Sequence, residues 1–255
     1  MSEASQPVSL PPEARVIAVT SGRGGVGATS LVANLALALL REGERVVVID
    51  AEVGLRNLDT ALGLDGLQEP TASLHHPRWP GLAFVRADAG NLDSLVRAQR
   101  STGARVLIDA PRAGAGGFGE AVRASDAVLL VLTPDASCLR DTEDALNALA
   151  EEGAPDAWLV VSRWRDGARP LRAETITLAQ LQDALATPML GVVPDDPRVV
   201  AGHNAGEPVV AGGDGPAARA FATIAQRTLG RAADDVPLRV EAAWYDVRRW
   251  IGLGA

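Results

Sequence analysis

The chain has little of several residue types that carry structure or chemistry in other proteins. Its 255 residues include one cysteine, Cys138, and three histidines, and 4% are aromatic. A single cysteine excludes an internal disulfide and a cysteine-rich metal cluster, so a reducing cytoplasm is the expected setting. No apolar run approaches the roughly 18 residues of a membrane-spanning helix. Residues 1–14 lack the charged-then-apolar pattern of a secretory signal, and we expect a short disordered lead-in there.

Basic residues are outnumbered by acidic ones, 24 to 32, which gives a formal net charge of −8. Binding of nucleic acid depends on neutralising phosphates, so we expect nucleic acid not to be a partner. His75 and His76 stand beside Pro77 in a stretch that is typical of a loop, and we predict that both lie on the surface.

Short apolar runs recur along the chain and alternate with helix-like stretches. Each run has five to seven residues rich in Val, Ile and Leu, which fits strands covered on both faces. This alternation indicates one α/β domain over residues 15–231, with a mainly parallel sheet flanked by helices. The runs cover residues 15–20, 45–50, 82–87, 105–110, 127–133, 157–162 and 189–193. The predicted helices cover 30–42, 92–101, 116–125, 136–152, 174–186 and 216–229.

The stretch "VTSGRGGVGATSLVANLALAL" (19–39) follows the first apolar run and opens the first predicted helix. Gly24, Gly25 and Gly27 permit a tight backbone bend, so that amides at the start of the helix can point at an anion. Thr29 and Ser30 add hydroxyl groups. The order of strand, glycines, hydroxyls and helix predicts a phosphate-binding loop (P-loop). The alternative is a tight strand-to-helix turn without a ligand.

This loop resembles the deviant Walker A motif, K-G-G-x-G-K-[T/S], of MinD/ParA-type ATPases. Further segments resemble the MinD branch of that family, and "GLRNLD" and "NAGEPVV" make the match fairly specific. The resemblance covers residues 15–231, except for a poorly matching stretch between residues 66 and 91. It implies a P-loop NTPase-like fold, ATP or ADP with Mg²⁺ as ligands, and a homodimer. The matching segments are 50–64, 108–114, 133–146, 172–185 and 191–210.

The resemblance also assigns roles to particular residues. Arg23 takes the place of the lysine that reaches phosphates across the dimer, and Asp50 and Glu52 take the places of the two switch carboxylates. Asp109 and Thr29 match the metal-side aspartate and the magnesium-binding hydroxyl. The resemblance therefore implies catalytic roles for Arg23, Asp50, Glu52 and Asp109. The implied nucleotide-binding residues are Gly24, Gly25, Val26, Gly27, Ala28, Thr29, Ser30, Arg163 and Pro194.

Two departures from the family pattern bear on activity. Ala28 replaces the lysine that contacts the β- and γ-phosphates within the same subunit, and Ser162 replaces the asparagine that usually contacts the base. A charge-assisted contact contributes about 1.5–3 kcal/mol, so binding should weaken roughly ten- to a hundred-fold. Hydrolysis should suffer more, because cationic stabilisation of the transition state contributes on the order of 10³–10⁵ in rate. We therefore expect nucleotide binding with weak or absent ATPase activity.

Ala28 has two explanations, natural divergence or an engineered knockout. The additional departures at Arg23, Glu52 and Ser162 favour divergence. The loop "RGGVGAT" resembles those of MinD-like relatives in pilus assembly (the TadZ/CpaE type) and cellulose synthesis (the YhjQ type), which often lack this lysine.

The final segment, 232–255, is predicted to be a linker followed by an amphipathic helix. Arginines flank its apolar, tryptophan-bearing face, as in helices that lie on a membrane surface. MinD proteins end in such a helix, but packing on the domain, on a second copy or on a protein partner is also open. The apolar face comprises Val240, Ala243, Trp244, Val247, Trp250 and Ile251.

Three functional hypotheses follow. The first is a MinD-like nucleotide-binding spatial regulator that places a cell-division site or another assembly, cytoplasmic and peripheral at the inner face of the membrane, with an unidentified regulatory protein as partner. The second is a nucleotide-independent scaffold of pilus or cellulose assembly. The third is an active ATPase in which Arg23 compensates for Ala28. ParA-like movement on DNA is disfavoured, because the sequence shows no evident basic surface.

Overall fold

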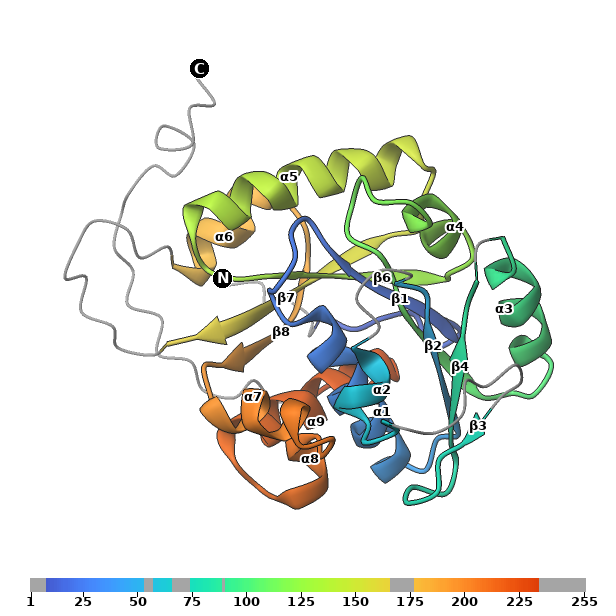
Figure 1. Ribbon diagram of the computed structural model, residues 1–255. Helices are drawn as coiled ribbons and strands as arrows, with labels where there is room; N and C mark the ends of the chain where they lie inside the picture. Colours follow the sequence, from blue (N-terminus) through green and yellow to red (C-terminus); the bar gives the residue numbers. More distant parts are fainter. Residues whose placement is uncertain (1–7, 53–56, 66–73, 89, 166–176, 234–255) are drawn as a thin grey trace.

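A central sheet organises the computed structural model, which describes residues 8–52, 57–65, 74–88, 90–165 and 177–233 (Figure 1). Within these residues the sheet has eight strands in the order β3-β4-β2-β5-β1-β6-β7-β8. Every neighbouring pair is parallel except β3 and β4. The predicted α/β class with a mainly parallel sheet is confirmed. The strands are β1 (Val16–Ser21), β2 (Val46–Asp50), β3 (Leu74–His75), β4 (Leu82–Arg86), β5 (Arg105–Asp109), β6 (Ala127–Leu132), β7 (Ala157–Trp164) and β8 (Met189–Pro194).

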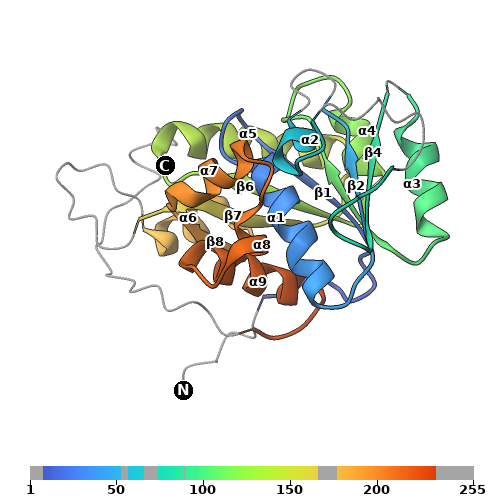
Figure 2. The same cartoon turned by 60° about the horizontal axis from the view of Figure 1, so that its bottom comes forward.

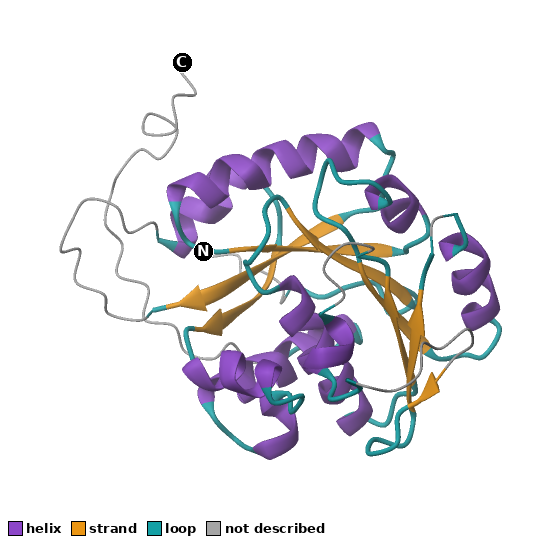
Figure 3. Cartoon of the chain, in the orientation of Figure 1, coloured by secondary structure: helices purple, strands orange, loops and turns teal. Residues whose placement is uncertain are grey.

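Helices cover both faces of this sheet, as Figure 2 and the purple ribbons of Figure 3 show. Helices α1, α2, α7, α8 and α9 gather on one face, and α3 to α6 lie on the other (Figure 1). The described helices are α1 (Ala28–Arg41), α2 (Leu58–Ala61), α3 (Leu92–Arg100), α4 (Phe118–Arg123), α5 (Ala136–Glu151), α6 (Leu178–Leu185), α7 (Pro197–Asn204), α8 (Val209–Gly212) and α9 (Pro216–Thr228).

The core strands are almost entirely apolar because both of their faces are covered. Strands β1, β5 and β6 are buried at every position, as expected for a parallel sheet between two helical layers. Helix α1 lies under the centre of the sheet, and nine consecutive residues, Leu31–Leu39, are buried in it. Burial on all sides of α1 holds the loop before it in a fixed place.

The carboxyl ends of the central strands meet at one edge of the sheet. The register places Asp50 at the end of β2 directly opposite Asp109 at the end of β5. Asp109 in turn stands opposite Val19 of β1, two residues before that strand ends. In open α/β sheets this edge, beside a change of strand order, is where ligands bind. Here the chain order reverses around β1, which lies between β5 and β6.

The ordered domain starts before the predicted boundary at residue 15. Leu10 is 1% exposed, and its amide donates to the carbonyl of Arg227 at 2.9 Å. Residues 8–14 therefore pack on the end of α9 instead of forming part of a disordered lead-in. The tail residues Trp244, Val247, Trp250 and Ile251, and the predicted linker and helix, lie outside the described residues. None of the described helices is long and apolar enough to cross a membrane.

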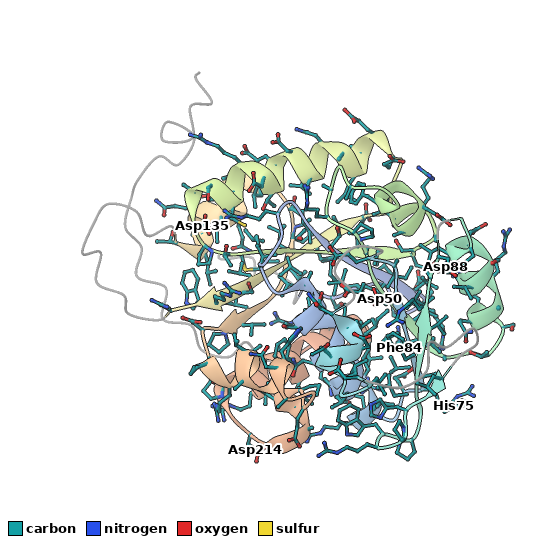
Figure 4. The ribbon with its side chains drawn as sticks, viewed as in Figure 1. Asp50, His75, Phe84, Asp88, Asp135 and Asp214 are labelled. Atoms are coloured by element: carbon teal, nitrogen blue, oxygen red, sulfur yellow. The ribbon has the colours of Figure 1, made fainter. Side chains whose placement is uncertain are left out.

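The prediction that both neighbouring histidines lie on the surface is wrong for one of them. His75 is exposed, as labelled in Figure 4, but His76 is 6% exposed and stacks on Trp79 with ring centroids 4.2 Å apart. The β3–β4 connection turns the His76 ring inward, where Nε2 donates to the carbonyl of Leu62 at 2.9 Å. Because a carbonyl only accepts, the proton is on Nε2, and Nδ1 accepts the amides of Arg78 and Trp79.

Candidate functional site

The loop between β1 and α1 has the backbone shape of an anion cradle. Gly25 and Gly27 have φ values of 80° and 102°, a region that glycine enters without steric cost. Gly27 caps α1, no side chain caps the helix, and no acidic residue lies in its first turn. The first amides of α1 are therefore available to an anion, and the helix dipole favours negative charge there.

Close packing on α5 directs the first basic residue of the loop. A Cβ at Gly22 would lie 2.0 Å from the carbonyl oxygen of Asp141, so only glycine fits between β1 and α5. The next side chain, Arg23, donates to Ser137 Oγ at 2.6 Å. It also lies 3.6 Å from Asp135 and 3.7 Å from Asp141. Arg23 thus points along α5 of its own chain.

Carboxylates crowd the opposite side of the cradle. Asp109 is 2% exposed, and the neighbouring Thr29 hydroxyl lowers its pKa against the larger effect of burial. Asp50 is also 2% exposed; its Oδ1 accepts the amide of Glu52 at 3.2 Å. The second oxygen, Oδ2, is buried and has no hydrogen-bond partner in the described part of the chain. Figure 4 labels Asp50 at this position near the end of β2.

Burial and mutual repulsion shift the proton affinity of this cluster. Burial raises the pKa of Asp50 to about 6, against the amide of Glu52 and the charge of Arg86, which lower it. Burial and the neighbouring Asp50 charge raise the pKa of Asp109 well above its usual value. Burial also raises the pKa of Glu52, and the charge of Arg112 lowers it. Such a cluster favours an added cation.

These residues fit a magnesium ion that is held partly by a phosphate ligand. Within the described residues, no three His, Cys, Asp or Glu side chains form a metal site by themselves. Mg²⁺ is commonly bound through one or two carboxylates with water and substrate phosphate, so a complete protein cage is not required. The unpartnered oxygen of Asp50 and the Thr29–Asp109 pair supply oxygen ligands of that kind.

A small cavity of about 60 Å³ lies on the other side of the cradle, between the loop and the ends of β7 and β8. Val26, Ser30 and Pro194 line it, together with Ser162 and Arg163. Ser162 Oγ donates to the carbonyl of Val26 at 2.5 Å, and Arg163 Nη2 donates to the carbonyl of Gly25 at 2.8 Å. Ser162, at the position of the asparagine that usually contacts the base, and Arg163, an implied nucleotide-binding residue, are therefore both bonded to the loop itself.

One contact at the cradle was not predicted from the sequence. Ser30 Oγ lies 3.1 Å from Nδ1 of His203 on α7, and burial lowers the pKa of His203. This contact joins residues 173 positions apart. The local sequence around Ser30 or His203 does not predict this contact, because it depends on how α7 packs beside α1.

Ala28 is the first residue of α1 and brings no charge to the cradle. The 24 basic residues of the chain are all arginines, and the sequence contains no lysine. A charge that replaces the missing P-loop lysine must therefore come from an arginine or a histidine. The structure brings together the predicted loop residues Gly24–Ser30 with Asp50, Glu52 and Asp109, and it turns Arg23 aside to α5.

Comparison with known proteins agrees with this geometry. The family described as "CobQ/CobB/MinD/ParA nucleotide binding domain" matches residues 17–209. The septum site-determining protein MinD of Synechocystis is 35% identical over 218 residues, which cover 77% of this chain and 82% of that protein. MinD of Helicobacter pylori is 30% identical over 265 residues, covering 92% and 98%.

A solved structure of a MinD protein is also similar to this chain. The MinC:MinD cell division protein complex of Aquifex aeolicus aligns with a TM-score of 0.78 and 30% identity, over 90% of this chain and all of that one. The residues that match the family, 17–209, include the loop, the carboxylate cluster and the ends of β7 and β8. The chain is a member of the CobQ/CobB/MinD/ParA family of nucleotide-binding domains.

Proposed function

We propose that the protein is a MinD-like spatial regulator that binds ATP or ADP with Mg²⁺ but hydrolyses ATP weakly or not at all. It would help to place a cell-division site or another assembly at the membrane. The observation that carries the proposal is the combination of an intact cradle and carboxylate cluster with Ala28 at the start of α1. The names of the relatives, which are septum site-determining proteins, support the cellular role.

The residues divide into a binding set and a catalytic set. The amides of Gly25–Thr29 would hold the phosphates, and Thr29, Asp109 and Asp50 would hold the metal ion. Bound Mg²⁺ would neutralise phosphate charge. Glu52 would orient a water molecule from the edge of the cradle, because its carboxyl is only partly buried.

Hydrolysis is limited by the absence of a cation at Ala28 and by the position of Arg23. Stabilisation of the transition state by such a cation contributes on the order of 10³–10⁵ in rate. Arg23 contacts Asp135, Ser137 and Asp141 of its own chain and would have to leave them to reach a second subunit. We therefore propose that the chain functions through nucleotide binding and dimerisation more than through ATP hydrolysis.

The proposed assembly is a homodimer attached to the inner membrane surface through the segment 232–255. A single short amphipathic helix binds weakly, so two helices in a dimer would gain affinity through avidity. A regulatory protein is a further proposed partner, since the related MinD of Aquifex aeolicus occurs in a complex with MinC.

A second candidate is a nucleotide-independent scaffold. The bonds from Ser162 and Arg163 to the loop carbonyls, with a cavity of about 60 Å³ beside them, favour it. Pockets that enclose ligands are usually several hundred Å³. A base would thus have to displace these side chains or lie at the surface.

Equilibrium binding of fluorescent ATP to the full chain, with and without Mg²⁺, distinguishes the nucleotide-binding regulator from the nucleotide-independent scaffold. The regulator binds ATP more tightly with Mg²⁺, and Asp109→Ala abolishes that gain. Asp88→Asn, at an exposed position, serves as the control and should bind like the wild type. Absence of binding, or unchanged affinity and dimerisation in Asp109→Ala, would support the scaffold instead.

A further inference from the structure

The charge at the cradle is unbalanced. Three carboxyl groups, those of Asp50, Glu52 and Asp109, influence one another there. Ala28 adds no positive charge, and a nucleotide would bring several negative charges. Magnesium offsets part of this charge, and the helix dipole offsets a smaller part. Binding of a triphosphate in this setting calls for a side-chain cation near its terminal phosphate.

Most described arginines that border the cradle are held by other groups. Arg23 donates to Ser137 and faces two aspartates on α5. Arg163 donates to the carbonyl of Gly25. Arg86 lies 2.6 Å from Asp59, and its side chain is 12% exposed. Each would have to break an existing contact before it could meet a phosphate.

Arg112 differs from these three. It follows Asp109 by three residues, in the segment that connects β5 to α4. Its side chain makes no hydrogen bond or ion pair among the described residues, and the residue is exposed. Its charge lowers the pKa of Glu52, the carboxylate at the edge of the same site.

The backbone around Arg112 is fixed beside the loop by three hydrogen bonds. The amide of Ala110 donates to Val19, and the amide of Ala113 donates to Ser21 at 2.9 Å. Between them, Thr20 Oγ1 donates to the carbonyl of Pro111 at 2.7 Å in a buried contact. These bonds run along the last residues of β1, directly before the P-loop. The segment therefore holds the backbone of Arg112 beside the last residues of β1, and the guanidinium makes no hydrogen bond or ion pair with a described residue.

We propose that Arg112 binds the γ-phosphate of ATP and supplies part of the positive charge that Ala28 does not. A planar guanidinium suits this task, because it can donate two parallel hydrogen bonds to phosphate oxygens. The assignment rests on the proposed nucleotide binding. It also gives the site a preference for ATP over ADP, since the contact is made to a group that ADP lacks.

Equilibrium titration of the full chain with fluorescent ATP and ADP, in Mg²⁺, tests the assignment. Arg112→Ala should weaken ATP binding about ten- to a hundred-fold and change ADP binding much less. Arg97→Ala is the matched control, because Arg97 is an exposed arginine on α3 paired with Asp93. It should bind both nucleotides like the wild type. In the double variant Ala28→Lys/Arg112→Ala, the restored lysine should recover ATP affinity.

A second double variant separates phosphate contact from neutralisation of Glu52. If Arg112 touches phosphate, Glu52→Gln/Arg112→Ala stays weak for ATP. Full recovery of ATP affinity in that variant would overturn the assignment. If the wild type binds ATP and Arg112→Ala binds it equally well, the assignment is also overturned. A wild-type chain that binds neither nucleotide would overturn the proposed function itself, and the assignment with it.

Discussion

Asp50 and Asp109 stand opposite each other at the ends of neighbouring parallel strands, both 2% exposed. Burial and the charge of one on the other raise the pKa of Asp109, and one oxygen of Asp50 has no partner. Two buried acids in register destabilise the fold when both are ionised. Positive charge placed beside the cluster would therefore stabilise its ionised form, and Mg²⁺ with a phosphate ligand would supply that charge.

The first prediction concerns Asp50→Asn and stability. The folded-state pKa is about 6 against an ordinary 3.8, so the folded protein holds this proton more tightly than the unfolded chain. The contribution to stability is full below about pH 4 and is lost as the pH rises through about 6. Asp50→Asn should be more stable than the wild type at pH 7.5 by about 3 kcal/mol, and similar to it at pH 4.

Urea denaturation at pH 4, 5.5 and 7.5, without nucleotide or Mg²⁺, measures this difference. Asp88→Asn removes an exposed carboxylate and should leave the pH profile unchanged. A wild type that is as stable as Asp50→Asn at pH 7.5 would show that burial of the Asp50 charge does not destabilise the fold.

The second prediction separates stability from assembly at Arg23. Its ion pairs of 3.6 and 3.7 Å join half-exposed side chains, and such pairs contribute about 0–1 kcal/mol. Arg23→Ala should therefore unfold within about 1 kcal/mol of the wild type yet lose nucleotide-dependent dimerisation, while Arg23→Lys should keep it. Sedimentation velocity with and without Mg-ATP reports the outcome. Equal dimerisation of Arg23→Ala and the wild type would exclude a role across the dimer.

The third prediction concerns the buried histidine. Burial lowers the pKa of His76, so the unfolded chain binds the proton more readily, and stability rises with pH across the interval below about 6.5. Protonation would also put a hydrogen on Nδ1, which accepts two amides. His76→Ala should lose about 2 kcal/mol at pH 8 and show a flatter pH profile.

His75→Ala, a change at the exposed neighbour, is the control and should behave like the wild type. Thermal or urea unfolding between pH 5 and 8 measures both variants. A wild-type profile in His76→Ala would contradict a buried, neutral His76 as the source of the pH dependence.

The fourth prediction concerns the C-terminal segment. If its apolar face inserts into the membrane surface, Trp244→Glu and Ile251→Glu should each abolish co-sedimentation with anionic vesicles, because a carboxylate does not enter the acyl boundary. Arg239→Gln, outside the apolar face, should weaken pelleting only slightly. Equal pelleting of wild type and both Glu variants would remove the membrane role and leave packing on protein.

Sequence patterns predicted the layers of the fold well because burial on both faces selects continuous apolar runs. All seven predicted strands occur, from β1 to β8 without β3. Strand β3 has two residues, neither of them buried, and it gives no periodic signal. Helix α7 has no buried residue, so apolar periodicity could not find it. Its aspartate cap and the proline at its start were the available signals.

The site was predicted in its backbone and less well in its side-chain contacts. Glycines, strand ends and carboxylates lie in local motifs, which is why Gly25, Gly27, Asp50 and Asp109 could be placed at one site. The bond from Ser162 to Val26 joins residues 136 positions apart. Such a contact depends on how β7 packs beside the loop, and no local pattern carries that information.

The most direct test of the account compares wild type and Ala28→Lys for Mg-ATP binding and turnover, with Ala28→Met as a control of similar length without charge. We predict that the wild type binds Mg-ATP with little turnover. Ala28→Lys should bind roughly ten- to a hundred-fold more tightly and turn over faster, and Ala28→Met should match the wild type. Wild-type turnover equal to that of Ala28→Lys, or no binding by the wild type, would contradict the account.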